Sequence, residues 1–146
     1  MQFWATIANI TGVTITAIAW IGEAYMANNV ELTDFSYLQE MSADEGLIRE
    51  MIQLFLANTP ESIDKMKQHL QENDFEALAS EAHKMKPTIN YMGVHSLENT
   101  IKSIESMAKQ QVEAHRISEL LEDMERVCDQ VYAELNMKLS RLNGES

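Results

Sequence analysis

Apolar residues recur three and four positions apart through most of the chain after residue 46, the spacing of an α-helix with one buried face. The pattern is clearest from Asp74 to Met92, and Gly93 then follows as a residue suited to end a helix. Only five glycines and two prolines occur, so turn formers are scarce. The sequence therefore predicts an all-α protein. The stripe of this central helix consists of Leu78, Ala82, Met85, Ile89 and Met92.

Capping patterns indicate where the helices begin. Ser42 with Glu45 fits the capping box, in which each side chain bonds the other residue's backbone amide. Asn73 with Glu76 repeats the pattern before the central helix, and Thr33 is a candidate cap for a short first helix. That short helix is expected around Leu32, Phe35 and Leu38. The helix after Ser42 has a stripe of Leu47, Ile48, Met51, Ile52, Leu54 and Phe55.

Thr59 and Pro60 interrupt this stripe before Ile63, Met66 and Leu70 continue it. Pro60 either kinks one long helix or lies in the first turn of a new one. Two more amphipathic helices follow Gly93, and the connections are short. We therefore expect an up-down antiparallel four-helix bundle, preceded by the short helix. The apolar faces of the last two helices are Leu97, Ile101, Ile104 and Ala108, then Ile117, Leu120, Leu121, Met124, Val127, Val131, Leu135 and Leu142.

Residues 1–29 differ in composition from the rest. No charged residue lies between Phe3 and Ile21, and a tryptophan stands near each end, as in a membrane-spanning helix. Asparagine, glycine and threonine dilute this apolar segment, and no lysine or arginine flanks it. We expect an apolar N-terminal extension followed by the bundle over 30–146. We rank an extra helix or arm on the bundle first, a membrane anchor second, and an extension left by cloning or readthrough third.

The charge balance limits the partners. The chain has 23 acidic and 11 basic side chains, a formal charge of −12, which argues against binding to nucleic acid or anionic membranes. Its single cysteine, Cys128, allows no intramolecular disulfide and agrees with a reducing, cytoplasmic compartment. Cys128 lies on an apolar stripe, which favours a core position over a nucleophile. We expect a cytoplasmic monomer.

His83 lies on the central helix, and at about 100° per residue it falls roughly opposite the apolar stripe. A neutral imidazole that faces water is suited to nucleophilic attack or phosphoryl transfer. Lys86 lies on the same side and can balance the charge of a phosphoryl group, while Lys84 points further round. Pro87 removes the amide that would bond the His83 carbonyl, so we expect a local kink. Small or polar neighbours of His83 are Ala79, Ser80, Pro87 and Asn90.

The run from Glu81 to Gly93 resembles the signature of the histidine-containing phosphotransfer (HPt) domain family. In that family an alanine-histidine pair is followed by lysine three residues after the histidine, then a small residue, and a glycine where the helix ends. The order and spacing of the helices also resemble the family's four-helix bundle. Pro87 stands where the family commonly has glycine, and this departure implies an altered partner surface.

The resemblance implies that His83 accepts a phosphoryl group from an aspartyl phosphate of a receiver domain and passes it to another receiver. Lys86 would steady the phosphoryl group. No cofactor or metal of its own is implied, because the receiver supplies magnesium and the activated carboxylate. The chain would then be a carrier without an ATP-binding or kinase site. The receiver would dock over the face that carries Ala79, Ser80, Lys84, Pro87 and Asn90.

Two other classes of protein also carry a histidine on the surface of a helix. A sensor histidine kinase core is disfavoured, because its motif has an acidic residue directly after the histidine, where this chain has Lys84, and because no glycine-rich nucleotide segment occurs. A non-catalytic adaptor bundle, with His83 as an ordinary surface residue, remains open. No metal site is expected, because none of His69, His95 and His115 has a second histidine or a cysteine at ligand spacing.

Overall fold

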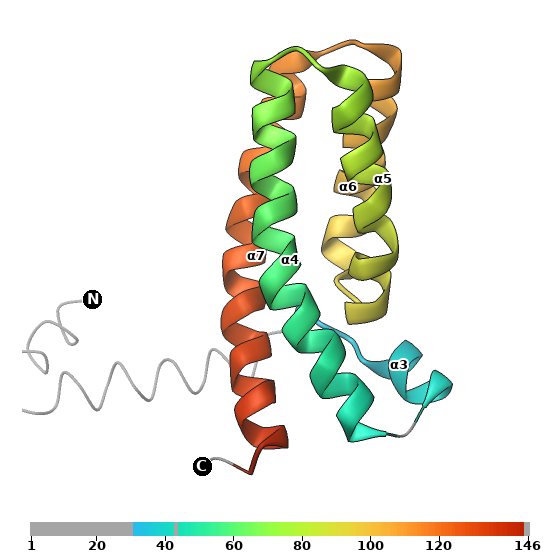
Figure 1. Cartoon of the computed structure of the whole chain (residues 1–146), viewed down its shortest axis with the longest axis vertical. Coiled ribbons are helices and arrows are strands. Elements are labelled where there is room, and N and C mark those ends of the chain that lie inside the picture. Colours follow the sequence, from blue (N-terminus) through green and yellow to red (C-terminus); the bar gives the residue numbers. More distant parts are fainter. Residues whose placement is uncertain (1–30, 43, 145–146) are drawn as a thin grey trace, which may run out of the picture. The chain divides into compact units, whose positions relative to one another are not determined.

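The computed structural model describes residues 31–42 and 44–144, and from Leu32 onward they belong to one compact unit. Figure 1 shows α4 to α7 running alternately up and down, with α3 beside one end of the bundle. No strand occurs in the two described ranges. The predicted all-α, up-down four-helix bundle with a short helix before it is confirmed. The helices are α3 (Ser36–Met41), α4 (Glu45–Gln71), α5 (Phe75–Met92), α6 (His95–Gln110) and α7 (Ala114–Leu142).

The four long helices form a closed ring around one core. Helix α4 packs on α5 and α7, and α6 packs on the same two helices from the other side. The stripes predicted for α5 and α6 are buried throughout, which is why each helix needs its neighbours on both sides. Leu54 is the exception on α4: it was expected in the stripe but is 46% exposed, because α4 turns Ile52 and Phe55 inward.

The helix caps lie one or two residues away from their predicted positions. Helix α4 is capped by Asp44, whose side chain accepts a hydrogen bond from the Gly46 amide, while Ser42 accepts one from the Asp44 amide. Helix α5 is capped by Asp74, whose side chain accepts from the Ala77 amide at 3.0 Å. The capping boxes expected at Ser42 and Asn73 were therefore wrong. An aspartate can fill this position as well as serine or asparagine, and the sequence pattern did not separate them.

Pro60 lies inside α4, which continues from Glu45 to Gln71 as one helix. Of the two alternatives for Pro60, the start of a new helix is wrong. The proline still removes one backbone bond, since it has no amide to donate to the carbonyl four residues earlier. Figure 1 shows that α4 changes direction along its length. The interruption in the stripe therefore marks a bend in one helix and not a boundary between two.

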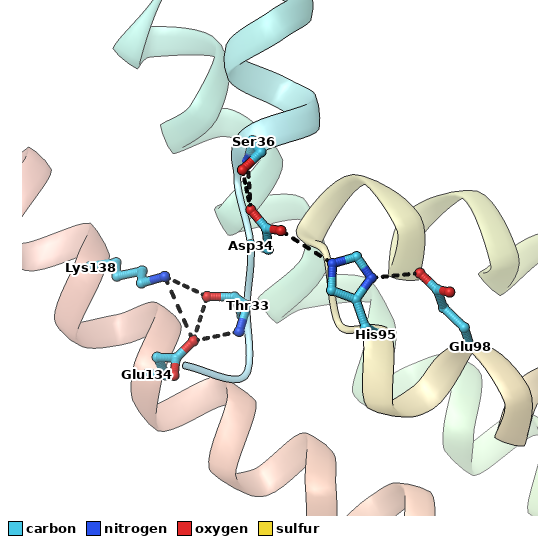
Figure 2. Close-up of polar contacts among 7 residues, drawn as sticks. All are labelled: Thr33, Asp34, Ser36, His95, Glu98, Glu134 and Lys138. Atoms are coloured by element: carbon cyan, nitrogen blue, oxygen red, sulfur yellow. Dashed lines mark hydrogen bonds and ion pairs between the residues drawn. The ribbon is translucent and has the colours of Figure 1, made fainter. Parts of the chain in front are cut away.

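Residues 32–35, which we call the strap, precede α3 and are not helical. The predicted first helix therefore begins later, at Ser36. Thr33 does not cap α3: it is buried, and its amide donates to the Glu134 carboxylate on α7 at 2.8 Å. Its hydroxyl also bonds Glu134 and accepts a hydrogen bond from Lys138 (Figure 2). Thr33 therefore bonds α7 and does not cap α3, although its local sequence had suggested a cap.

Residues 1–29, for which we expected an extra helix or arm, a membrane anchor or an extension left by cloning or readthrough, lie outside the described residues. Within the described part, no helix combines the length and the apolar character that crossing a bilayer demands. The boundary between extension and bundle stays a prediction.

Candidate functional site

His83 lies in the middle of α5, and its side chain is 67% exposed. The exposure follows from the helical period, because the stripe of Leu78, Ala82, Met85, Ile89 and Met92 is buried on roughly the opposite side of the helix. The helix runs unbroken through Pro87 to Gly93, which adopts a left-handed conformation with φ of 63°. Both the exposure of His83 and the end of the helix at Gly93 are as predicted.

A buried carboxylate from α6 lies behind the histidine. Glu105 is 6% exposed, and its Oε1 is 2.9 Å from His83 Nδ1. Lys86 Nζ donates to the other oxygen, Oε2, at 2.8 Å, and Lys109 Nζ donates to Oε1 at 2.7 Å. One carboxylate therefore gathers the imidazole and two ammonium groups from two helices at one point of the surface.

The charge of Glu105 fixes the hydrogen-bonding role of the imidazole. Hydrogen bonds from Lys109 and Lys86, with a smaller one from His83, hold the pKa of Glu105 down at about 2. An ionised carboxylate can only accept, so His83 Nδ1 carries the hydrogen and donates it. In a neutral ring the lone pair then lies on Nε2. No hydrogen bond to Nε2 is found among the residues that the structure describes.

Two hollows flank His83 on the surface between α5 and α6. One has a volume of about 500 Å³, and its lining includes Ser80, His83 and Lys109. The other, of about 400 Å³, is lined by His83, Lys86 and Pro87 together with further residues of both helices. The imidazole thus stands on a ridge with space on either side, where a partner surface can reach it.

The structure places the remaining predicted site residues on the same helix with different exposure. Ser80, Pro87 and Asn90 are exposed around His83. Lys84 is also exposed and lies 3.9 Å from Glu81, away from Glu105. The prediction for Ala79 was wrong. It was expected on the exposed face, but it is buried against the core and contributes only to the lining of the larger hollow.

Sequence reasoning missed Glu105 and Lys109. A signal for Glu105 was present, because it falls within the apolar stripe of α6 between Ile101 and Ala108, where a charged residue has to find a partner. Lys109 then follows one turn later at i+4, the spacing of a helical ion pair. The partner on α5 could not be identified without knowing how the two helices face each other.

The other histidines and the cysteine do not join this site. Among the described residues no group of three or more side chains of histidine, cysteine, aspartate or glutamate is arranged to hold a metal ion. Cys128 is buried in the core, and this burial raises the pKa of its thiol to about 11. His115 lies on the outside of α7 and pairs with Glu119 at 3.2 Å.

Comparison with known proteins gives one positive result. The family model described as Hpt domain matches residues 50–142, which include His83, Glu105 and both lysines that contact Glu105. A search of curated proteins and a search of solved structures each gave no match. The match covers more than half of the 146 residues. The chain therefore belongs to the Hpt domain family, whose members are phosphocarriers that interact with receiver domains in two-component signalling.

Proposed function

We propose that His83 is the phosphoacceptor of this Hpt domain and that Nε2 is the atom that receives the phosphoryl group. The observation that carries the proposal is the pairing of an exposed imidazole with a buried carboxylate at 2.9 Å. This pairing holds the ring at Nδ1 and turns Nε2 away from Glu105. Exposure alone would not suffice, because a freely rotating surface histidine presents no defined nucleophile.

The transfer requires one bond to form and one to break. The Nε2 lone pair attacks the phosphorus of a receiver aspartyl phosphate, and the bond from phosphorus to the aspartate oxygen breaks. The electron pair of that bond leaves with the receiver carboxylate. Positive charge then develops on the ring, whose Nδ1 hydrogen remains bonded to Glu105, so the carboxylate stabilises the product. Transfer to a second receiver is the same step in reverse.

Lys86 and Lys109 are proposed to stabilise the phosphoryl group. Both ammonium groups lie within 2.8 Å of a Glu105 oxygen, so they are held close to the ring before the phosphoryl group arrives. An incoming phosphate brings about two negative charges, which two neighbouring cations favour. They also make this part of the surface basic in a chain of formal charge −12, where a phosphorylated partner would otherwise be repelled.

The receiver is proposed to dock over the ridge between the two hollows. Ser80, Pro87 and Asn90 line this region with short side chains, and the hollows add residues of α6. The docking face is therefore wider than the α5 residues that the sequence suggested. Because the domain acts by presenting one nucleophile, we propose that it is a carrier and not a kinase.

The test is phosphorylation of the purified chain by a radiolabelled phosphorylated receiver, with a small phosphoramidate as a second donor. We expect label that is lost in acid and survives base, as a phosphohistidine requires. His83→Gln should abolish labelling and leave helicity and the unfolding midpoint nearly unchanged, since an exposed helical position carries little packing energy. His115→Gln is the matched control, because it removes another exposed histidine that pairs with a carboxylate.

Labelling of the folded His83→Gln variant would assign the phosphoryl group elsewhere and overturn the proposal. Absence of label on the wild-type chain with both donors would instead favour the adaptor function, in which the face around His83 binds a partner without chemistry.

A further inference from the structure

The strap is anchored to the bundle at two separate places. At Thr33 the anchor is Glu134 of α7, which also accepts a hydrogen bond from the Leu32 amide at 2.9 Å. At Asp34 the anchor is the turn between α5 and α6, where the Asp34 amide donates to the Met92 carbonyl at 3.0 Å. Figure 2 shows the two anchors on opposite sides of the strap. This second anchor lies beside α3, which begins two residues after Asp34, at Ser36.

A single histidine connects the second anchor to α6. His95 Nε2 lies 3.2 Å from Asp34 Oδ2, and His95 Nδ1 lies 2.9 Å from Glu98 Oε1 (Figure 2). An ionised carboxylate can accept hydrogen bonds but cannot donate them, so both ring nitrogens of His95 have to donate. Only the protonated imidazolium has two hydrogens on nitrogen. The observed geometry therefore needs a charged His95.

We propose that Asp34, His95 and Glu98 form a proton-dependent latch that holds the strap and α3 on the turn between α5 and α6. When His95 releases its proton to solvent, the neutral ring keeps one N–H and can donate to only one of the two carboxylates. The other carboxylate then faces a nitrogen lone pair, and its contact with the ring is lost. In either tautomer Asp34 also loses its attraction to a charged ring, so the Asp34 side chain and α3 are held less tightly, while the strap stays attached at Thr33 and at the Met92 carbonyl.

The pKa shifts agree in sign with this geometry. Glu98 and Asp34 raise the pKa of His95 above its ordinary value, and hydrogen bonds from Ser36, then from His95, lower the pKa of Asp34 to about 2. A raised histidine pKa means that the stabilisation is complete below the ordinary value of 6.5 and is lost as pH rises through the higher folded value. The latch is therefore closed in mild acid and opens on the alkaline side.

The groups that face the ring are few. Among the described residues, Asp34 from the strap and Glu98 from α6 are the charged groups that shift the pKa of His95, and no charged side chain of α3 or α5 does so. All three latch residues are partly or largely exposed, with His95 at 64%. Exposed ion pairs contribute little, so we expect a graded switch of roughly two- to fivefold in the opening equilibrium.

Opening of the latch would weaken the contacts between α3 and the bundle. Leu38 of α3 is 1% exposed, and Tyr37 stacks on Tyr91 of α5 with ring centroids 5.7 Å apart. Loosening the strap would expose the Leu38 side chain and separate the two tyrosine rings. The amide of Ser42, which donates to the Leu38 carbonyl at 2.9 Å, would lose protection.

The experiment is an NMR titration of the full chain from pH 5.5 to 9, with the His95 ring protons and the amides of residues 33–42 as probes. Amide exchange is expressed as protection relative to the intrinsic rate, which removes the ordinary effect of pH. We expect the His95 midpoint to lie above 6.5 and protection in α3 to fall by roughly two- to fivefold with the same midpoint.

Three variants test the assignment. His95→Gln should make protection in α3 independent of pH over this range, and Glu98→Gln should lower the His95 midpoint. His115→Gln should leave both readouts as in wild type, because His115 lies on α7 away from the strap. A His95 midpoint at or below 6.5 would overturn the latch. Protection in α3 that does not follow the His95 titration, or that keeps its pH dependence in His95→Gln, would overturn it as well.

Discussion

Glu105 is the residue on which the proposed site depends most. Its side chain is almost fully covered, yet it is charged, and it keeps that charge because three donors from α5 and α6 converge on it. The same carboxylate orients the His83 ring and positions Lys86 and Lys109. Removing one lysine should therefore have a smaller effect than removing the histidine, since the other lysine and the carboxylate remain.

Lys86→Ala is expected to slow phosphoryl transfer to His83 by about tenfold without stopping it, because one of two cations near the phosphoryl group is lost. The measurement is the rate of label transfer from one phosphorylated receiver under single-turnover conditions. Lys65→Ala is the matched control, since Lys65 pairs with Glu61 in an exposed i, i+4 pair on α4. A Lys86→Ala rate equal to that of the control would remove Lys86 from the proposed role.

Gly93, at the end of α5, both ends the helix and leaves room for the strap. Gly93 has φ of 63°, a conformation that costs other residues energy, and it ends the helix that carries His83. The strap also crosses directly over it. A Cβ at this position would lie 2.6 Å from the Asp34 Cβ and overlap the Asp34 carbonyl oxygen. The glycine is therefore needed by the helix end and by the packing of the strap.

Gly93→Ala is expected to lower the free energy of unfolding by more than the ~1–2 kcal/mol of a left-handed alanine, because the strap has to move as well. Urea unfolding followed by circular dichroism measures this loss. Gly144→Ala is the control, since Gly144 has φ of 75° and an added Cβ there meets nothing within 4 Å. If the two substitutions cost the same, the strap does not press on Gly93 as the structure indicates.

For the whole molecule, contacts between the two ends of the described chain complete the bundle. Arg49, near the start of α4, donates to the Asn143 side chain at 2.8 Å and to the Leu142 carbonyl at 3.0 Å. Thr33 reaches Glu134 on α7, a separation of 101 residues in the sequence. The Thr33 contact, like those of Glu105, makes stability depend on the charge of a carboxylate that the fold has brought to its partners.

Stability is expected to fall in acid for this reason. The pKa of Glu105 is lowered from 4.5 to about 2, so its contribution is complete above 4.5 and is lost as pH falls through about 2. Glu105→Gln should lower the free energy of unfolding by about 1 kcal/mol at pH 7, and this difference from wild type should shrink toward zero near pH 2. Urea unfolding at pH 7, 4.5 and 2.5 measures the difference.

Glu61→Gln serves as the control for the acid series, because it removes a carboxylate from an exposed pair, where ion pairs contribute little. A difference between wild type and Glu105→Gln that stays constant with pH would contradict the assigned charge of Glu105.

The helices, their order and the exposure of His83 could all be predicted from the sequence. These features follow from the periodicity of apolar residues, a local property that any helix with one buried face has to satisfy. The apolar stripe of α5 placed His83 on the outside, and Gly93 marked the end of the helix, without knowledge of any neighbour. The assignment of residues 1–29 as a separate extension remains a prediction.

The residues that meet across helices could not be predicted in this way, because they depend on how the folded helices pack. Glu105 is 22 residues from His83, and its role depends on the rotation of α6 against α5, which local patterns do not specify. The strap shows the same limit, because Thr33 is a good helix cap by local rules but bonds Glu134 instead. Local periodicity fixes which face of a helix is buried, whereas the partner of a polar group depends on the packing of the whole bundle.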